Sequence, residues 1–103
     1  MNDPDLRQAL EKIISPRILV VGDLMLDHYS WGEVDRISPE APIPVMRVLR
    51  EDQRLGGAGN VVMNLTALGA QVLVCGVTGK DKTGNTILKL LSENEADHSG
   101  VIV

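Results

Sequence analysis

The sequence predicts an α/β fold built on parallel strands, with a small β excursion after the first strand. Uninterrupted apolar runs at 18–21 and 72–77 are typical of strands buried on both faces of a parallel sheet. Segments with helical spacing of apolar residues alternate with these runs. The resulting order, strand, excursion, helix, strand, helix and strand, implies parallel pairing with right-handed crossovers.

The first predicted element is an amphipathic helix over residues 5–14. Leu6, Leu10 and Ile13 fall on one face of such a helix, and Pro16 ends it. The apolar strand follows directly and ends at a glycine. We therefore interpret residues 1–15 as an N-terminal helical extension of the domain.

The segment between the first strand and the first crossover helix has a different character. Residues 24–55 are more polar than their surroundings and carry prolines between positions 39 and 44. Two extended stretches are expected, at 27–34 and 45–49, the second with apolar residues on both sides. We interpret this segment as short strands that leave the main sheet.

Regular α/β spacing resumes after this excursion. A helix is predicted over 58–68, with Gly69 just past its end, and a second helix over 83–94. The third apolar strand is expected to begin at Val101. Because a natural C-terminus usually ends in polar residues, the apolar end at Val103 leads us to expect a fragment or a truncated gene product.

Composition excludes several classes of function. The 103 residues suffice for one small domain, which we assign to 16–103. A formal net charge of −4 offers no basic surface for nucleic acid or an anionic membrane, and no apolar run reaches membrane-spanning length. The charged N-terminus lacks a signal-peptide core, so a cytoplasmic protein is expected. His28 and His98 are isolated, and no metal site is assigned.

Two glycine motifs resemble phosphate-binding loops, but each lacks residues that such a loop requires. Gly57-Ala58-Gly59 begins like a dinucleotide fingerprint, but Val62 occupies the third glycine position. Gly79-Lys80-Asp81 lacks both the first glycine and the final serine or threonine of a P-loop. Neither motif predicts a nucleotide site.

A sugar site is indicated by the start of the excursion. If this stretch is extended, Asp27, Tyr29, Trp31 and Glu33 point to one side. A carboxylate accepts hydrogen bonds from hydroxyls, and flat rings cover the apolar surface of a sugar. The alternative is that both aromatic side chains only pack a lid against the body of the protein, and spacing leaves both open.

The glycine-rich turn before the first crossover helix is a second candidate. Gly56 and Gly57 would let a ligand approach the backbone, and free N–H groups at the helix start would face it. Asn60 in the first turn can cap the helix or donate to a ligand. A tight turn with an ordinary cap explains these residues equally well.

Three segments together resemble the ribokinase, or phosphofructokinase-B, superfamily. They are Val21 to Asp27, Arg36 to Val45, and Gly56 to Asn60. Within that superfamily, the stretch Arg-Ile-Ser-Pro-Glu-Ala-Pro is similar to heptose 7-phosphate kinases, the kinase half of the bifunctional heptose kinase/adenylyltransferase. The spacing of Asn60, Gly69 and Gly79 fits the family's first signature. Val62 departs from it, since a small residue is expected there.

The resemblance implies a ribokinase-like three-layer sandwich with a small β lid at 27–55, here truncated after the first parallel strands. It places the sugar site between lid and body and implies a homodimer formed through the lid. Asp27 would accept from sugar hydroxyls, with the two aromatic rings beside it. The other implied substrate-binding residues are Gly56, Gly57 and Asn60 in the pocket and Arg36, Ser38 and Glu40 in the lid region of the heptose branch.

The resemblance also implies a reaction. The intact enzyme would use ATP and Mg²⁺ to phosphorylate the anomeric hydroxyl of D-glycero-D-manno-heptose 7-phosphate, for ADP-heptose and lipopolysaccharide core synthesis. The family's Gly-Ala-Gly-Asp motif, which carries the catalytic base, does not occur in this sequence. No catalytic residue is assigned, ATP and Mg²⁺ are not expected to bind this chain well, and activity is left open. The alternatives are a kinase for another sugar, a non-catalytic relic and a lid-mediated interaction module.

Overall fold

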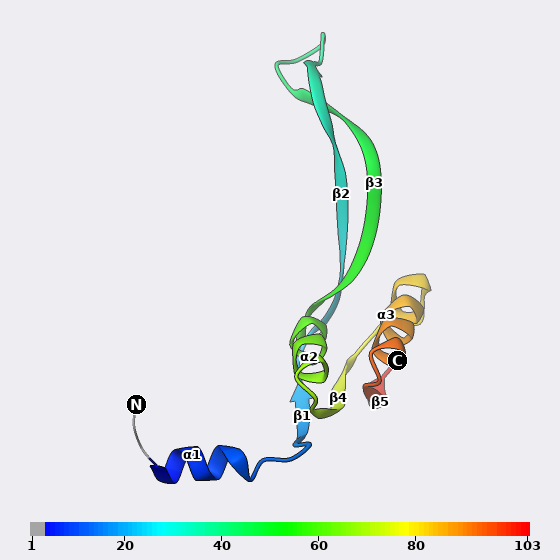
Figure 1. Cartoon of the computed structure of the whole chain (residues 1–103). Coiled ribbons are helices and arrows are strands. Elements are labelled where there is room, and N and C mark those ends of the chain that lie inside the picture. The colour runs from blue at the N-terminus through cyan, green and yellow to red at the C-terminus, as the bar shows by residue number, and fades with distance from the viewer. Residues whose placement is uncertain (1–3) are drawn as a thin grey trace.

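The computed structural model describes residues 4–103 and confirms the predicted α/β class (Figure 1). Three strands form a parallel sheet in the order β1-β4-β5, and two form a separate antiparallel hairpin, β2-β3. The elements in chain order are α1 (Pro4–Glu11), β1 (Arg17–Val21), β2 (Leu24–Ile37), β3 (Pro44–Gly57), α2 (Ala58–Ala67), β4 (Gln71–Val77), α3 (Lys82–Glu93) and β5 (Asp97–Ile102).

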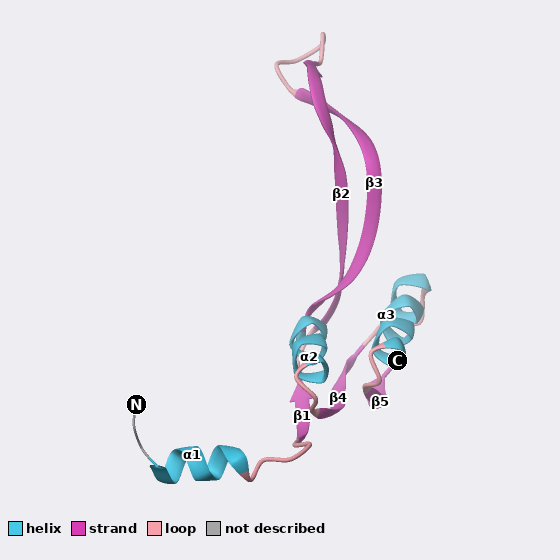
Figure 2. Ribbon diagram, in the orientation of Figure 1, coloured by secondary structure: helices cyan, strands magenta, loops and turns pink. Residues whose placement is uncertain are grey.

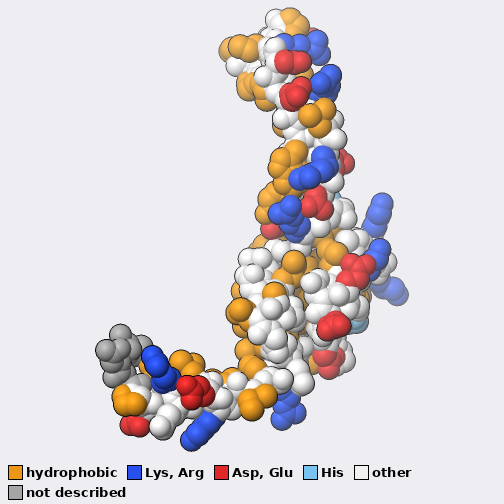
Figure 3. Space-filling view, viewed as in Figure 1, with side chains coloured by type: hydrophobic (Ala, Val, Ile, Leu, Met, Phe, Trp, Pro, Cys, Tyr) orange, Lys and Arg blue, Asp and Glu red, His pale blue; other side chains and the backbone are white. Residues whose placement is uncertain are grey.

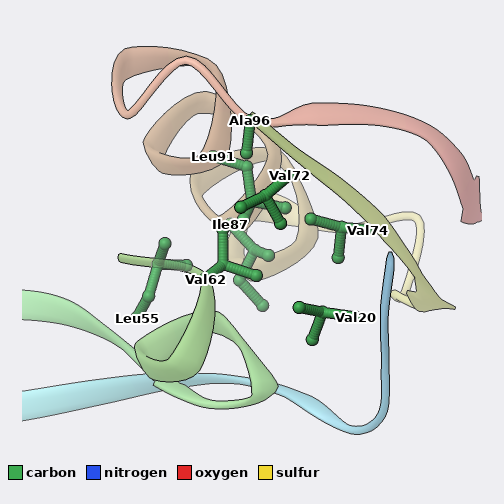
Figure 4. Close-up of a cluster of buried hydrophobic side chains, with 8 residues drawn as sticks. All are labelled: Val20, Leu55, Val62, Val72, Val74, Ile87, Leu91 and Ala96. Carbon is green, nitrogen blue, oxygen red and sulfur yellow. The ribbon is translucent and has the colours of Figure 1, made fainter. Parts of the chain in front are cut away.

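Both crossover helices pack on the same face of the parallel sheet. The buried residues Val20, Val72 and Val74 on that face join Val62 of α2 and Leu91 of α3 in one core (Figure 4). The crossovers share one hand and run in one direction across the sheet, so both helices cover the same side. The described residues therefore supply the sheet and one helical layer of the sandwich.

The opposite face of the sheet is exposed in this chain, which corrects the expectation that the strands are buried on both faces. Leu19 and Val21 of β1 are 58% and 70% exposed, and Val77 of β4 is 68% exposed. Their apolar side chains are typical of a parallel-sheet face on which helices pack. Among residues 4–103, no element covers it, because the only remaining helix, α1, lies away from the sheet (Figure 2).

The excursion is one long hairpin, and the expectation of short strands is wrong. Each strand has 14 residues, and they pair from Leu24↔Gly57 to Ile37↔Pro44 with two register shifts. The prolines cause no early break, since they lie in the turn and at the first position of β3, where no inner ladder N–H is needed. The hairpin projects from the body and gives the molecule extents of 65 × 40 × 19 Å (Figure 1).

Two other element boundaries differ from the expectation. α1 ends at Glu11, three residues before the predicted end at Ile14. β5 begins at Asp97, four residues before the predicted start at Val101. Its polar first residues belong to the strand because their backbone pairs with β4, beginning at Leu73↔Asp97. No helix within residues 4–103 combines the length and apolarity needed to cross a membrane.

The crossover helices end in the same hydrogen-bonded motif, with different residues at its left-handed position. After α2, Gly69 (φ 93°) donates to the Thr66 carbonyl, and Ala70 donates to the Leu65 carbonyl. After α3, the equivalent left-handed residue is Glu95, with φ 60°. Glycine adopts this conformation freely, whereas a side chain at Glu95 makes it unfavourable.

We therefore expect opposite effects from two substitutions at these equivalent positions. Glu95→Gly should raise the free energy of unfolding by up to about 1 kcal/mol, since it removes left-handed strain. Gly69→Ala should lower it by roughly the same amount, although open space surrounds the new methyl group. Urea unfolding followed by far-UV circular dichroism measures both, and a change of the same sign in the two variants would contradict the assignment.

Candidate functional site

Asp27 and Gly56 meet where the hairpin leaves the body. In the antiparallel register, Met25 faces Gly56 and Asp27 faces Arg54, so Asp27 lies diagonally across from the glycine. A methyl group built on Gly56 would overlap both carboxylate oxygens of Asp27. Gly56 is buried, and because it has no side chain the Asp27 carboxylate can lie against the glycine turn.

The Asp27 carboxylate is half-buried and has no hydrogen-bond or ion-pair partner within residues 4–103. Its neighbour Arg54 directs its guanidinium to Asp52 instead, with Nε 2.9 Å from Oδ2. A carboxylate held in place with its acceptor sites unused can accept hydrogen bonds from an incoming ligand. This is the arrangement that recognition of hydroxyl groups requires.

The glycine turn brings the start of α2 beside this carboxylate. Gly57 has φ 56°, and the next amide, that of Ala58, donates to the Asp23 carbonyl at 2.8 Å. Gly57 is the N-cap residue, and no side chain in the described part of the chain caps the first turn. Asn60 lies exposed in that turn and is not the N-cap residue, so capping by Asn60 is excluded while the tight turn itself is present.

The predicted alternation along the first hairpin strand is confirmed. The rings of Tyr29 and Trp31 stack with centroids 5.6 Å apart and an interplanar angle of 23°. Arg50 lies 4.1 Å from the Trp31 ring centroid, and Arg54 lies 4.8 Å from the Tyr29 centroid and 5.3 Å from that of Trp31. We call this surface the aromatic–arginine face; it consists of Asp27, Tyr29, Trp31, Arg50, Asp52 and Arg54.

The aromatic rings do not pack a lid onto the body of this chain. Tyr29 and Trp31 are 41% and 36% exposed, and their rings stack on each other and lie beside the two arginines. Figure 3 shows basic and hydrophobic side chains lying together along the projecting hairpin. The rings therefore form an accessible surface that continues outward from Asp27.

One carboxylate on this face is held in its charged form. A hydrogen bond from Arg54 lowers the pKa of Asp52, helped by the backbone N–H of Gln53 and the charge of Arg50. Arg50 has no carboxylate partner within residues 4–103; outward along the same strand, Arg47 pairs with Glu33 at 3.1 Å. Arg50 and Arg54 thus both act on the charge of Asp52, but only Arg54 forms an ion pair with it.

The residues expected in the heptose-branch lid lie at the outer end of the hairpin, away from Asp27. Arg36 is nine positions beyond Asp27, about 30 Å along an extended strand. Ser38 and Glu40 lie in the turn, where the Ser38 hydroxyl accepts a hydrogen bond from the Glu40 amide at 3.3 Å. The structure brings Asp27, Gly56, Gly57 and the α2 start together, and it separates the tip residues from them within one chain.

The sequence analysis did not identify the residues that β3 contributes to the candidate site. Arg50, Asp52 and Arg54 recur at every second position, a signal that would have placed them on one face had the hairpin register been known. A cavity of about 540 Å³ between the hairpin and α3 was also missed. Tyr29 and Asp52 of the aromatic–arginine face line it from the hairpin together with His28 and Gln53. Residues of α3, some 60 positions from His28 in the sequence, line its other side.

The fold and motifs agree with a comparison to known families. The pfkB family of carbohydrate kinases matches residues 15–103. This chain belongs to that family. It is close to the heptose 7-phosphate kinase part of its relatives and corresponds to their N-terminal portion.

Curated relatives share about half or more of the aligned residues. The bifunctional protein HldE of Citrifermentans bemidjiense is 54% identical over 101 residues, which is 98% of this chain and 21% of HldE. The D-beta-D-heptose 7-phosphate kinase of Bordetella bronchiseptica is 59% identical over 83 residues, covering 81% of this chain and 26% of that enzyme. The chain thus spans about a quarter or less of these relatives.

Solved structures support the fold. A protein assigned as a ribokinase from Agrobacterium tumefaciens superposes with a TM-score of 0.67 at 27% identity, over 86% of this chain and 28% of that one. The ribokinase of Cryptococcus neoformans, solved in complex with ADP, gives a TM-score of 0.55 at 24% identity, over 86% and 27%. The part of the ribokinase-like fold found here is therefore confirmed.

The contact between Gly56 and Asp27 is testable by a double-mutant cycle. We expect Gly56→Ala to lower the free energy of unfolding by roughly 1–3 kcal/mol, because the methyl group displaces the carboxylate. In an Asp27→Ala background the same change should cost less, with a coupling of about 0.5–3 kcal/mol. Equal costs in both backgrounds, measured by urea unfolding, would show that the carboxylate is not the obstacle.

The Asp52–Arg54 pair gives the hairpin a pH dependence of known sign. Because the folded pKa of Asp52 is lowered, its stabilising contribution is complete above the ordinary value of 3.8 and is lost as pH falls below it. Trp31, the only tryptophan, should report this loss as a fluorescence change between about pH 6 and about pH 2. Asp52→Asn should remove that part of the change, and an identical profile in the variant would rule out the pair as its source.

Proposed function

We propose that this chain is the sugar-binding part of a heptose 7-phosphate kinase. The observation that carries the proposal is the unpartnered Asp27 carboxylate held against Gly56 beside the open first turn of α2. The high identity to the Bordetella heptose 7-phosphate kinase and to HldE supports the choice of sugar. Asp27 accepts hydrogen bonds from the sugar hydroxyls, and the open backbone at Gly56 and Gly57 lets the ring come close.

Other groups near the turn complete the sugar site in this proposal. Asn60 extends from the first turn of α2, where its amide can donate to a hydroxyl that Asp27 leaves unpaired. The stacked rings of Tyr29 and Trp31 cover an apolar flank of the substrate. Arg36, Ser38 and Glu40 lie too far out to reach a sugar bound by Asp27 of the same chain, so any role for them requires a second copy.

The whole enzyme would transfer a phosphoryl group from ATP, with Mg²⁺, to the anomeric hydroxyl of D-glycero-D-manno-heptose 7-phosphate in the cytoplasm, toward ADP-heptose and lipopolysaccharide core. The residues of this chain fit the sugar and not the nucleotide. The α3 start that follows Gly79 and Lys80 is filled by its own Asp81 carboxylate, which accepts from the Gly84 amide at 2.8 Å. ATP and Mg²⁺ therefore belong to other parts of the enzyme.

The outer half of the hairpin supports a homodimer through the lid. Val34 and Met46 face each other across the strands and are 59% and 43% exposed, and Val48 is 47% exposed. A two-stranded ribbon with exposed apolar side chains gains stability when a second ribbon covers it. A second copy of this hairpin is the partner that we propose.

The sugar site is tested by titrating the chain with heptose 7-phosphate in a calorimeter. Asp27→Ala should weaken binding by roughly 1.5–3 kcal/mol, the value of hydrogen bonds to a charged group. Asp35→Ala, which removes an exposed carboxylate farther along the same strand, is the matched control and should leave affinity unchanged. Equal affinity of the wild type and Asp27→Ala for the sugar would show that Asp27 does not bind the substrate.

A further inference from the structure

The aromatic–arginine face continues from Asp27 in evenly spaced rows. Asp27 is directly opposite Arg54, Tyr29 is opposite Asp52, and Trp31 is opposite Arg50. Successive rows on one face of a strand are about 7 Å apart. The guanidinium of Arg54 reaches outward over Tyr29, so its charge lies one row beyond the Asp27 carboxylate.

The two guanidinium groups on this face converge on one ring. Arg50 lies 4.1 Å and Arg54 5.3 Å from the centroid of Trp31. Stacking on an aromatic ring uses the flat face of a guanidinium and leaves its N–H edge free to donate. The Arg54 side chain is 50% exposed, so its remaining donors are accessible to a ligand.

The unused guanidinium donors on this face can bind an anion. Asp52 is the only acidic side chain bonded to either arginine within residues 4–103, and of the two arginines it bonds only Arg54. Asp27, the other carboxylate of this face, lies against Gly56 and bonds neither arginine, so guanidinium N–H groups remain available beside the stacked rings. A phosphate group matches the planar donor edges of arginine. It also supplies the negatively charged partner that Arg50 does not have within residues 4–103.

We propose that Arg50 and Arg54 bind the phosphate that the sugar substrate already carries, and so select phosphorylated sugars over free sugars. This inference rests on the proposed function, because it takes Asp27 as the anchor for the sugar hydroxyls. A sugar held at Asp27 with its carbon chain directed along the hairpin brings its terminal phosphate to the row of Tyr29 and the Arg54 guanidinium. The Asp52 carboxylate, which is bonded to Arg54, occupies part of that position.

Asp52 weakens the binding of a ligand phosphate in this proposal. Its carboxylate competes with a ligand phosphate for the Arg54 donors, since both are oxyanions. Replacing it by Asn keeps the size of the side chain and removes the competing charge. The Asp52→Asn variant should therefore bind a sugar phosphate more tightly, while its affinity for the free sugar stays the same.

The test compares two ligands, D-glycero-D-manno-heptose 7-phosphate and the same heptose without phosphate. Trp31 fluorescence and calorimetry on the full chain report binding, and far-UV circular dichroism confirms that each variant keeps its fold. Arg50→Gln and Arg54→Gln should each reduce the preference for the phosphorylated ligand by at least about tenfold. Arg50→Lys should lose less, since it keeps the charge. Arg47→Gln is the matched control and should leave the preference intact, because Arg47 pairs with Glu33.

The outcomes separate this inference from the proposed function. If both heptoses bind equally and the arginine variants change neither, the phosphate role is overturned while the sugar site stands. If neither heptose binds, the proposed function fails and this inference falls with it. A preference for the phosphorylated sugar that disappears in Arg50→Gln and Arg54→Gln, persists in Arg47→Gln and grows in Asp52→Asn supports the assignment.

Discussion

The contact between the Asp27 carboxylate and the backbone of Gly56 is the constraint on which the site depends. Leu55, the residue before that glycine, is 3% exposed and anchors the second hairpin strand in the core. The next two glycines then lead directly into α2. Because Gly56 has no side chain, the first strand can bring a charged group to this junction without a clash. Any side chain there would separate the carboxylate from the helix start and thus divide the candidate sugar site.

The projecting hairpin must be stabilised without a core of its own. A two-stranded ribbon in water is marginal, and its stability comes from cross-strand side-chain pairs. Here those pairs are the rings of Tyr29 and Trp31 under Arg50 and Arg54, together with the Arg47–Glu33 ion pair. The aromatic–arginine face therefore has two roles in our account, since the same side chains hold the strands together and present donors to a ligand. Substitutions there require a folding control.

Local sequence signals predicted the body of the fold well because its elements are decided by local physics. Continuous apolar runs and period-3.6 apolar spacing predicted the α/β class, and Gly69 marked the end of α2 through its left-handed conformation. The hairpin length was missed because its strands are exposed, so polar residues alternate with apolar ones and no continuous apolar run reveals them. The expectation of strands buried on both faces failed because burial depends on which helices cover the sheet, and crossover direction put both on one side.

The sequence by itself determined the family, the α/β class and the candidate residues Asp27, Gly56, Gly57 and Asn60, because glycines and a carboxylate at fixed spacing form a recognisable motif. Only the tertiary structure decided which residues meet. Hairpin register put Arg54 opposite Asp27 and Arg50 opposite Trp31, although these residues are 27 and 19 positions apart in the sequence. It also carried Arg36 away from the site, since distance along an extended strand grows with every residue. Pairing across strands is a long-range choice that no local pattern encodes.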